Sequence, residues 1–126
     1  MQVLLDTHTL LWYIDGDSKL SNSVNLIIKN AEKVYVSIVS FWELSIKIGL
    51  DKLQLKPSIR EIYTELLRND ISMLSIEIIA IENLILLPYH HRDPFDRMLV
   101  AQALAHNLVL VSKDEQLKKY AVTVLW

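Results

Sequence analysis

Short apolar runs alternate with segments of helical periodicity along this chain, and the alternation constrains the fold more than any other feature. The apolar runs are at 3–5, 34–36, 71–76, 108–111 and 121–126. Predicted helices separate them, at 10–14, 21–30, 41–48, 57–67, 77–87 and 96–106, with a short charged helix at 114–120. Strands that are apolar throughout are typical of parallel sheets buried on both faces. The pattern therefore predicts an α/β fold with a parallel sheet.

Length and composition fit one domain with a substantial core. The chain has 126 residues, 52% of them apolar, with two glycines and three prolines, so we expect a single domain over residues 1–126. The absence of cysteine excludes disulfides, thiolate metal sites and a cysteine nucleophile. The opening residues have no basic leader and are too short to span a bilayer, which predicts a soluble, cytoplasmic protein. With a net charge of −2, any phosphate substrate must be held by local positive groups or bound metal.

Two aspartates follow predicted strands at their carboxyl ends. Asp6 comes directly after the run 3–5, and Asp114 comes shortly after the run 108–111. Sites in parallel α/β sheets form beyond the carboxyl ends of strands, so both side chains are expected at the same rim. The alternative for each is a helix N-cap, which is a common role of aspartate at this position.

Two further acids stand near the starts of predicted helices. Glu43 lies within the apolar stretch 41–44, where an unpartnered buried carboxylate would be costly; the alternative is a solvated helix face shared with Ser40 and Lys47. Asp96 shares the inward face of its helix with apolar residues, and its alternative is a first-turn acid favoured by the helix dipole. Asp93, followed by proline, is the better cap candidate.

Together these four acids indicate a metal site. Four carboxylates near one rim repel one another unless a cation neutralises them. Oxygen ligands without cysteine favour Mg²⁺ or Mn²⁺ over Zn²⁺. A divalent ion so held can activate water and stabilise charge on a phosphoryl group.

Four motifs resemble those of PIN-domain toxins of the VapC type. The first is Leu4-Leu5-Asp6-Thr7-His8-Thr9-Leu10-Leu11-Trp12, and the second comprises Ser37, Ser40, Trp42-Glu43-Leu44 and Lys47. The third is His91-Arg92-Asp93-Pro94-Phe95-Asp96-Arg97-Met98-Leu99-Val100-Ala101-Gln102-Ala103, and the fourth is Leu110-Val111-Ser112-Lys113-Asp114. The resemblance spans the whole chain, and the third motif is its most specific part.

The resemblance implies a three-layer α/β/α domain with a five-stranded parallel sheet in the order 3-2-1-4-5. It implies Mg²⁺ ligands, with Mn²⁺ as a substitute, at Asp6, Glu43, Asp96 and Asp114, and it selects Asp96 over Asp93. It also implies an endoribonuclease that serves as the toxin of a type II toxin–antitoxin system, is neutralised by a cognate antitoxin and forms a homodimer. One or two ions, and tRNA, rRNA or mRNA as substrate, are all compatible with these motifs.

The other polar and aromatic residues of the motifs have two interpretations each. Ser112 matches a family position near the metal, and Thr7 is a second accessory candidate. Arg97 and Lys47, with Arg92 and Lys113, flank the acids as phosphate contacts or simple surface charge. The four histidines fit no metal spacing and are interpreted as solvated or locally hydrogen-bonded. Trp12 and Trp42 are expected in the core, with an antitoxin contact as the alternative.

Three other functions could use an aspartate after the first strand or the same fold. A haloacid-dehalogenase-like phosphatase needs a second acid two residues after the first, where this chain has His8. A receiver-like phosphoacceptor domain would leave Glu43 and Asp96 without a role. A catalytically inactive PIN-fold binding module would not need the four intact acids.

Overall fold

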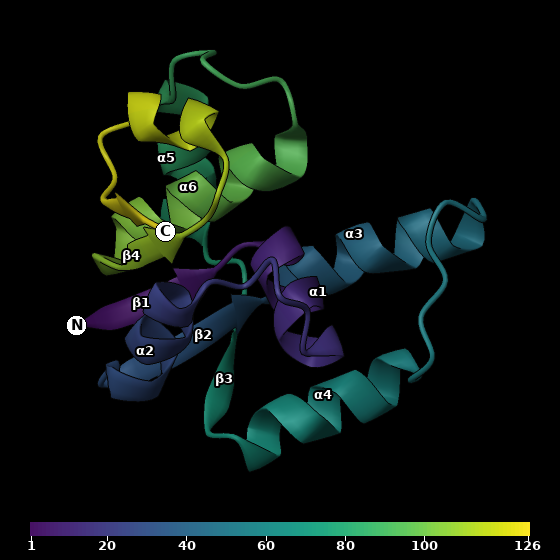
Figure 1. Cartoon of the computed structure of the whole chain (residues 1–126). Coiled ribbons are helices and arrows are strands. Elements are labelled where there is room, and N and C mark those ends of the chain that lie inside the picture. Colours follow the sequence, from purple (N-terminus) through teal and green to yellow (C-terminus); the bar gives the residue numbers. More distant parts are fainter.

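Five parallel strands form one sheet in the order β3-β2-β1-β4-β5 in the computed structural model, which describes residues 1–126 (Figure 1). The strands are β1 (Gln2–Leu5), β2 (Lys33–Ser37), β3 (Ile71–Leu74), β4 (Val109–Val111) and β5 (Val124–Leu125). The helices are α1 (Thr7–Asp15), α2 (Asn22–Asn30), α3 (Ile38–Gly49), α4 (Ile59–Arg68), α5 (Ile78–Leu86), α6 (Pro94–His106) and the 3₁₀ helix η1 (Glu115–Lys119). The expected strand order is confirmed.

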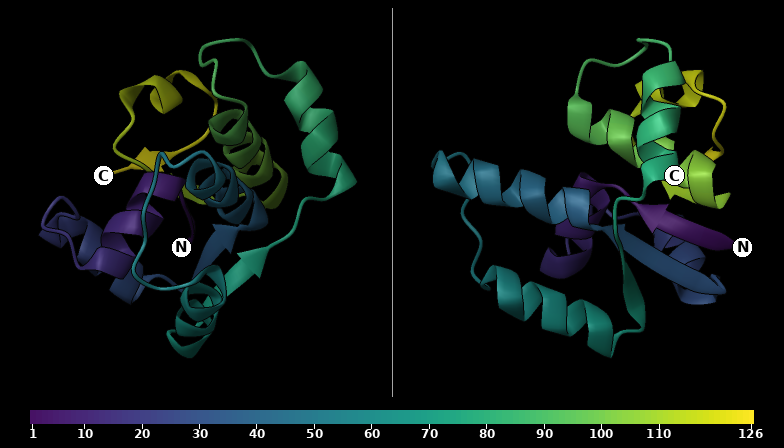
Figure 2. Two further views of the ribbon diagram at one scale, coloured as in Figure 1. Left: turned by 90° about the vertical axis from the view of Figure 1, so that its right-hand side faces the viewer. Right: turned by 180° about the vertical axis from the view of Figure 1, so that it is seen from behind.

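Helices cover both faces of the sheet, which makes three layers. Alternate residues of a strand point to opposite faces, so Val3 and Leu5 of β1 pack in one core with α1, α2 and α4, whereas Leu4 packs in the other with α6. The two turned views in Figure 2 show α5 and α6 on one side of the sheet and α4 on the other. Burial on both faces explains why the strands are apolar throughout.

Side-chain caps set where most helices begin. Asp6, Ser21, Ser37, Ser58 and Asp93 each accept a backbone N–H in the first turn of the helix that follows, satisfying a donor that has no partner within the helix. Helices α1, α3 and α6 therefore start two to three residues earlier than their apolar periodicity predicted. The last strand is shorter than expected, since only Val124–Leu125 pairs with β4.

Helix α3 runs outward from the carboxyl end of β2 (Figure 1, right) and carries an exposed tryptophan. Its inner side buries Phe41 and Leu44, whereas Trp42 is 58% exposed. The expectation that Trp42 lies in the core is wrong, because the helical rotation that buries its neighbour turns it away. Trp12 is half-buried against the core. No helix has the length and apolar character needed to cross a membrane.

Candidate metal centre

Asp6 stands at the carboxyl end of β1, beside the end of β4. Leu5 pairs with Val111, so Asp6 and Ser112 come next on neighbouring parallel strands. The residue is 3% exposed. Its Oδ1 accepts the Thr9 N–H at 2.9 Å and the Thr9 hydroxyl at 2.6 Å, and Oδ2 accepts the Ser112 hydroxyl at 2.5 Å. Asp6 is thus both the N-cap of α1 and a buried acid at the rim, so the two interpretations of this residue are not exclusive.

Asp114 follows β4 and is linked to Asp6 through Ser112. The Asp114 N–H donates to Ser112 Oγ at 3.1 Å, while that hydroxyl donates to Asp6. Asp114 Oδ1 caps η1 by accepting the Gln116 N–H at 2.9 Å. Ser112, which is 1% exposed, therefore orients both strand-end acids at once. This accessory candidate lies between Asp6 and Asp114.

Glu43 lies on α3 and is buried, so the solvated-face interpretation does not apply. The residue is 4% exposed. Its Oε2 pairs with Lys47 Nζ at 2.8 Å, whereas its buried Oε1 has no hydrogen-bond partner. One turn earlier, Ser40 Oγ accepts the Thr7 hydroxyl at 2.9 Å and ties α3 to the start of α1. The unpartnered oxygen is costly unless something outside the protein satisfies it.

Asp96 lies in the first turn of α6, and Asp93 is the cap of that helix, as predicted. Asp93 Oδ1 accepts the Phe95 N–H at 2.8 Å and the Asp96 N–H at 3.3 Å. Burial, and then the negative charges of Asp93 and Asp6, raise the pKa of Asp96 to about 7; His91 lowers it and Glu43 raises it by lesser amounts. Burial also raises the pKa of Asp6, against its bonds from Ser112 and Thr9. The acids of β1, α3 and α6 therefore share one electrostatic environment.

His91 is a member of this centre that the sequence interpretation missed. Its Nε2 lies 2.8 Å from Asp114 Oδ2 and 3.5 Å from Asp96 Oδ2. One donor atom from each of these three residues lies within 4.8 Å of the others. Its position could have indicated this role, because His91 opens the third motif, two residues before the α6 cap. The four histidines were interpreted as one set, and as a set they have no metal-ligand spacing.

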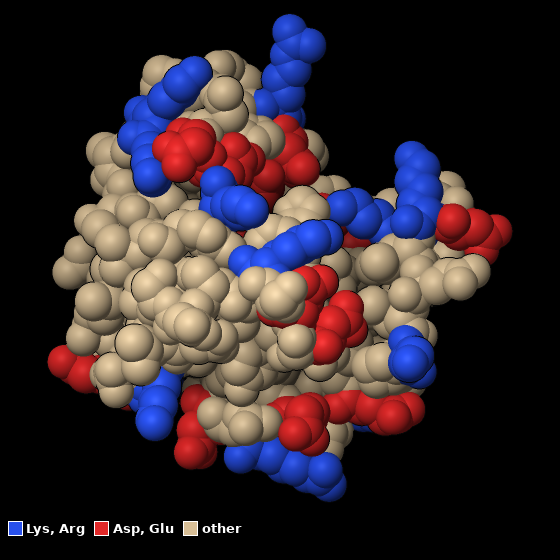
Figure 3. Space-filling view, viewed as in Figure 1, with Lys and Arg blue, Asp and Glu red and all other residues tan.

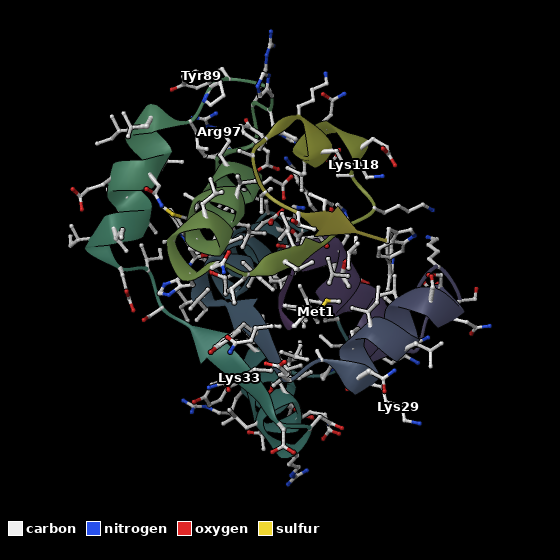
Figure 4. The ribbon with its side chains drawn as sticks, turned by 90° about the vertical axis from the view of Figure 1, so that its left-hand side faces the viewer. Met1, Lys29, Lys33, Tyr89, Arg97 and Lys118 are labelled. Carbon is white, nitrogen blue, oxygen red and sulfur yellow. The ribbon has the colours of Figure 1, made fainter.

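Arg97 is placed differently from its expected role as a phosphate contact. The residue is 5% exposed, and its guanidinium donates to Pro88 O at 2.8 Å, Leu87 O at 3.3 Å and Tyr120 Oη at 3.2 Å. It also lies 4.0 Å from the Tyr89 ring centroid, and Figure 4 shows the two labelled residues near each other. Because the buried guanidinium donates three hydrogen bonds inside the protein, Arg97 fixes the loop before α6 and does not reach a substrate.

The residues present suit a hard divalent cation. The donor set is carboxylate oxygen, one buried oxygen of Glu43 is unpartnered, and burial, followed by neighbouring negative charges, raises the pKa of Asp96. Each feature describes negative charge that a cation would relieve. Oxygen donors of this kind favour Mg²⁺ and Mn²⁺.

Comparisons with known proteins agree with this architecture. The PIN domain family matches residues 3–122. The chain is 27% identical over 119 residues to Ribonuclease VapC22 of Mycobacterium tuberculosis, covering 94% of this chain and 91% of that protein.

Solved structures share the fold at low sequence identity. VapBC2 from Rickettsia felis, bound to a DNA fragment from its promoter, superposes with a TM-score of 0.74 and 16% identity over 99% of this chain and 98% of that one. DNA-bound VapBC from Salmonella typhimurium gives a TM-score of 0.72 and 18% identity over 99% and 97% of the two chains.

Proposed function

Because this chain belongs to the PIN-domain family, we propose that it is a metal-dependent endoribonuclease that hydrolyses RNA phosphodiester bonds. The observation that carries the proposal is the pair of buried carboxylates of Asp6 and Glu43, the latter with an unpartnered oxygen, together with the half-buried cluster of Asp96, Asp114 and His91. Buried negative charge of this kind is unfavourable for folding, and a bound catalytic cation would neutralise it. The relative named as a ribonuclease supports the same activity.

We propose that Asp6, Glu43, Asp96 and Asp114 hold the ion, Mg²⁺ with Mn²⁺ as a substitute. When bound, a divalent ion lowers the pKa of water and neutralises charge on a phosphoryl group. The protein orients the acids in advance: Thr9 and Ser112 fix both oxygens of Asp6, and Lys47 holds Oε2 of Glu43, leaving Oε1 for the ion. Preorganisation of this kind reduces the cost of assembling the site.

Positive side chains near the rim are suited to hold RNA phosphates. Lys113 stands between Ser112 and Asp114 and is exposed, as is Arg92, and Lys47 is 37% exposed while it pairs with Glu43. In Figure 3, blue side chains border the red acidic ones across the upper half of the molecule. Local cations beside an acidic centre fit a phosphate substrate better than the overall charge of −2 does.

Purified protein incubated with RNA tests the activity directly. We expect cleavage with Mg²⁺ or Mn²⁺, none in EDTA, and recovery when the metal is restored. Asp6→Asn should be inactive, while Asp15→Asn, an exposed acid at the end of α1, should cleave normally. Cleavage that persists in EDTA would exclude the metal mechanism, and inactivity under every metal condition would favour a binding module.

We further propose that the chain is a cytoplasmic toxin neutralised by an antitoxin. A toxin–antitoxin complex from Klebsiella pneumoniae has a chain with this fold. A mostly apolar groove between α3 and α4 is suited to an apolar antitoxin segment, and it is lined by Ile38, Phe41, Ile59, Arg60, Tyr63 and Met73. Induced expression should arrest growth, and either Asp6→Asn or co-expression of a small protein encoded beside this chain should relieve the arrest. Harmless expression of the wild type alone would contradict this role.

We propose a homodimer formed through α5. One side of this helix contacts α6; Ala80 is fully buried and Leu84 packs against the core that contains α6 residues. On the other side, Ile78, Ile81 and Ile85 are 72%, 41% and 78% exposed at helical spacing. A stripe of this kind can pair with its own copy. Light scattering should find a dimer for the wild type and for Leu26→Lys, an exposed apolar position on α2, but a monomer for Ile81→Lys/Ile85→Lys. A monomeric wild type would refute the interface.

A further inference from the structure

The ring of His91 is held above two of the acids by a loop with fixed backbone positions. The loop joins α5 to α6, and the His91 side chain is 17% exposed. The His91 N–H donates to Tyr120 Oη at 3.0 Å, and the same oxygen accepts from Arg97. Arg97 also binds the carbonyls of Leu87 and Pro88. The position of the ring is therefore set by the tertiary structure.

Hydrogen bonds determine which ring nitrogen carries the proton. The backbone N–H of Asp93 donates to His91 Nδ1 at 3.0 Å, so Nδ1 must present its lone pair. In the neutral ring the hydrogen is then on Nε2, which faces Asp114 Oδ2 at 2.8 Å and Asp96 Oδ2 at 3.5 Å. Nε2 is thus a donor toward carboxylates.

This tautomer is incompatible with metal coordination through Nε2. A ligand nitrogen needs a free lone pair, so coordination would move the proton to Nδ1, opposite the Asp93 N–H. Two donors would then face each other at the N-cap of α6. Separating these two donors would require breaking the turn that positions Asp93 and, three residues later, Asp96.

We propose that His91 is a positioning residue whose Nε2–H holds the Asp114 carboxylate for metal binding, and that it is not a ligand. This inference rests on the proposed metal-dependent function. Asp114 then has a donor on each oxygen, Gln116 N–H on Oδ1 and His91 on Oδ2, while Oδ2 keeps a second lone pair for the ion. The ion meets oxygen ligands only, which keeps the preference for Mg²⁺ and Mn²⁺ over Zn²⁺.

Two spectroscopic measurements on wild-type protein test the inference without RNA. Histidine ¹⁵N chemical shifts should identify the Nε2–H tautomer of His91 both in EDTA and with Mg²⁺. Pulsed electron paramagnetic resonance of the Mn²⁺-loaded protein should show no directly bonded nitrogen. A ring protonated on Nδ1 but not on Nε2 in the Mg²⁺-loaded protein, or direct manganese–nitrogen coupling lost in His91→Gln, would show that His91 is a ligand and overturn the proposal.

Affinity for Mn²⁺, measured by calorimetry, tests the positioning role. His91→Leu should weaken binding by about 10- to 100-fold, the usual effect of losing a group that orients a ligand. His91→Gln, whose amide can donate from a similar place, should restore most of the affinity. His90→Leu, at the neighbouring exposed histidine, should bind as the wild type does. Equal affinity in His91→Leu would refute the role; intact Mn²⁺ binding without RNA cleavage would refute only the proposed nuclease function.

Discussion

RNA cleavage by Asp96→Asn should fall about a thousandfold or more, while its metal-free folded state becomes more stable than the wild type. Loss of a ligand removes several kcal/mol of charge stabilisation from the reaction. The same change removes a carboxylate whose pKa is raised to about 7 by burial and by Asp93 and Asp6, and so should increase the free energy of unfolding by roughly 1 to 3 kcal/mol at about pH 8 in EDTA. A loss of activity together with a gain in stability is expected when a metal-binding acid is substituted, and is not expected for an acid with a structural role.

Asp93→Asn is the matched control for this variant. Asparagine can also cap a helix, so α6 should keep its start and cleavage should stay within a few-fold of the wild type. Cleavage rates and urea unfolding curves for both variants give the comparison. A large activity loss in Asp93→Asn with little in Asp96→Asn would transfer the ligand role to Asp93.

Stability of the metal-free protein should fall as the pH rises. The pKa of Asp96 is raised from 3.8 to about 7 in the folded state, so between these values the folded protein keeps a proton that the unfolded chain has released. The resulting stability is fully present below about pH 4 and is lost as the pH rises through about 7. Unfolding in EDTA should therefore cost roughly 2 to 3 kcal/mol less at about pH 8 than at about pH 5. The raised pKa of Asp6 acts in the same direction.

Binding of Mg²⁺ and the substitution Asp96→Asn should each remove the pH dependence of the free energy of unfolding. Mg²⁺ binds the ionised acids, and an excess of about a hundredfold over its Kd at about pH 8 should restore about 2.7 kcal/mol. Asp96→Asn should flatten the profile in EDTA, whereas Asp51→Asn, at an exposed turn position, should retain it. Urea titrations at both pH values measure the four cases, and a wild-type profile no steeper than that of Asp96→Asn would contradict the prediction.

The sequence contained enough to predict the layers and the rim where the acids lie. Strand alternation and periodicity are local properties, and the apolar strands indicated burial on both faces. Boundaries were less accurate, because caps such as Ser37 and Asp93 start their helices before the apolar pattern does. Trp42 was misplaced because a helical repeat shows which residues share a face but not which face meets the core.

By itself the sequence determined the fold class, the parallel sheet and the acids available at its carboxyl end, since these follow from residue type and spacing. The tertiary structure alone decided how each acid is held: Ser112 between Asp6 and Asp114, and a buried Glu43 with one oxygen unpartnered. It also turned Arg97 inward and brought His91 against Asp96 and Asp114. Contacts between residues far apart in the chain depend on how loops and helices pack around the rim, and spacing along the sequence carries no information about that packing.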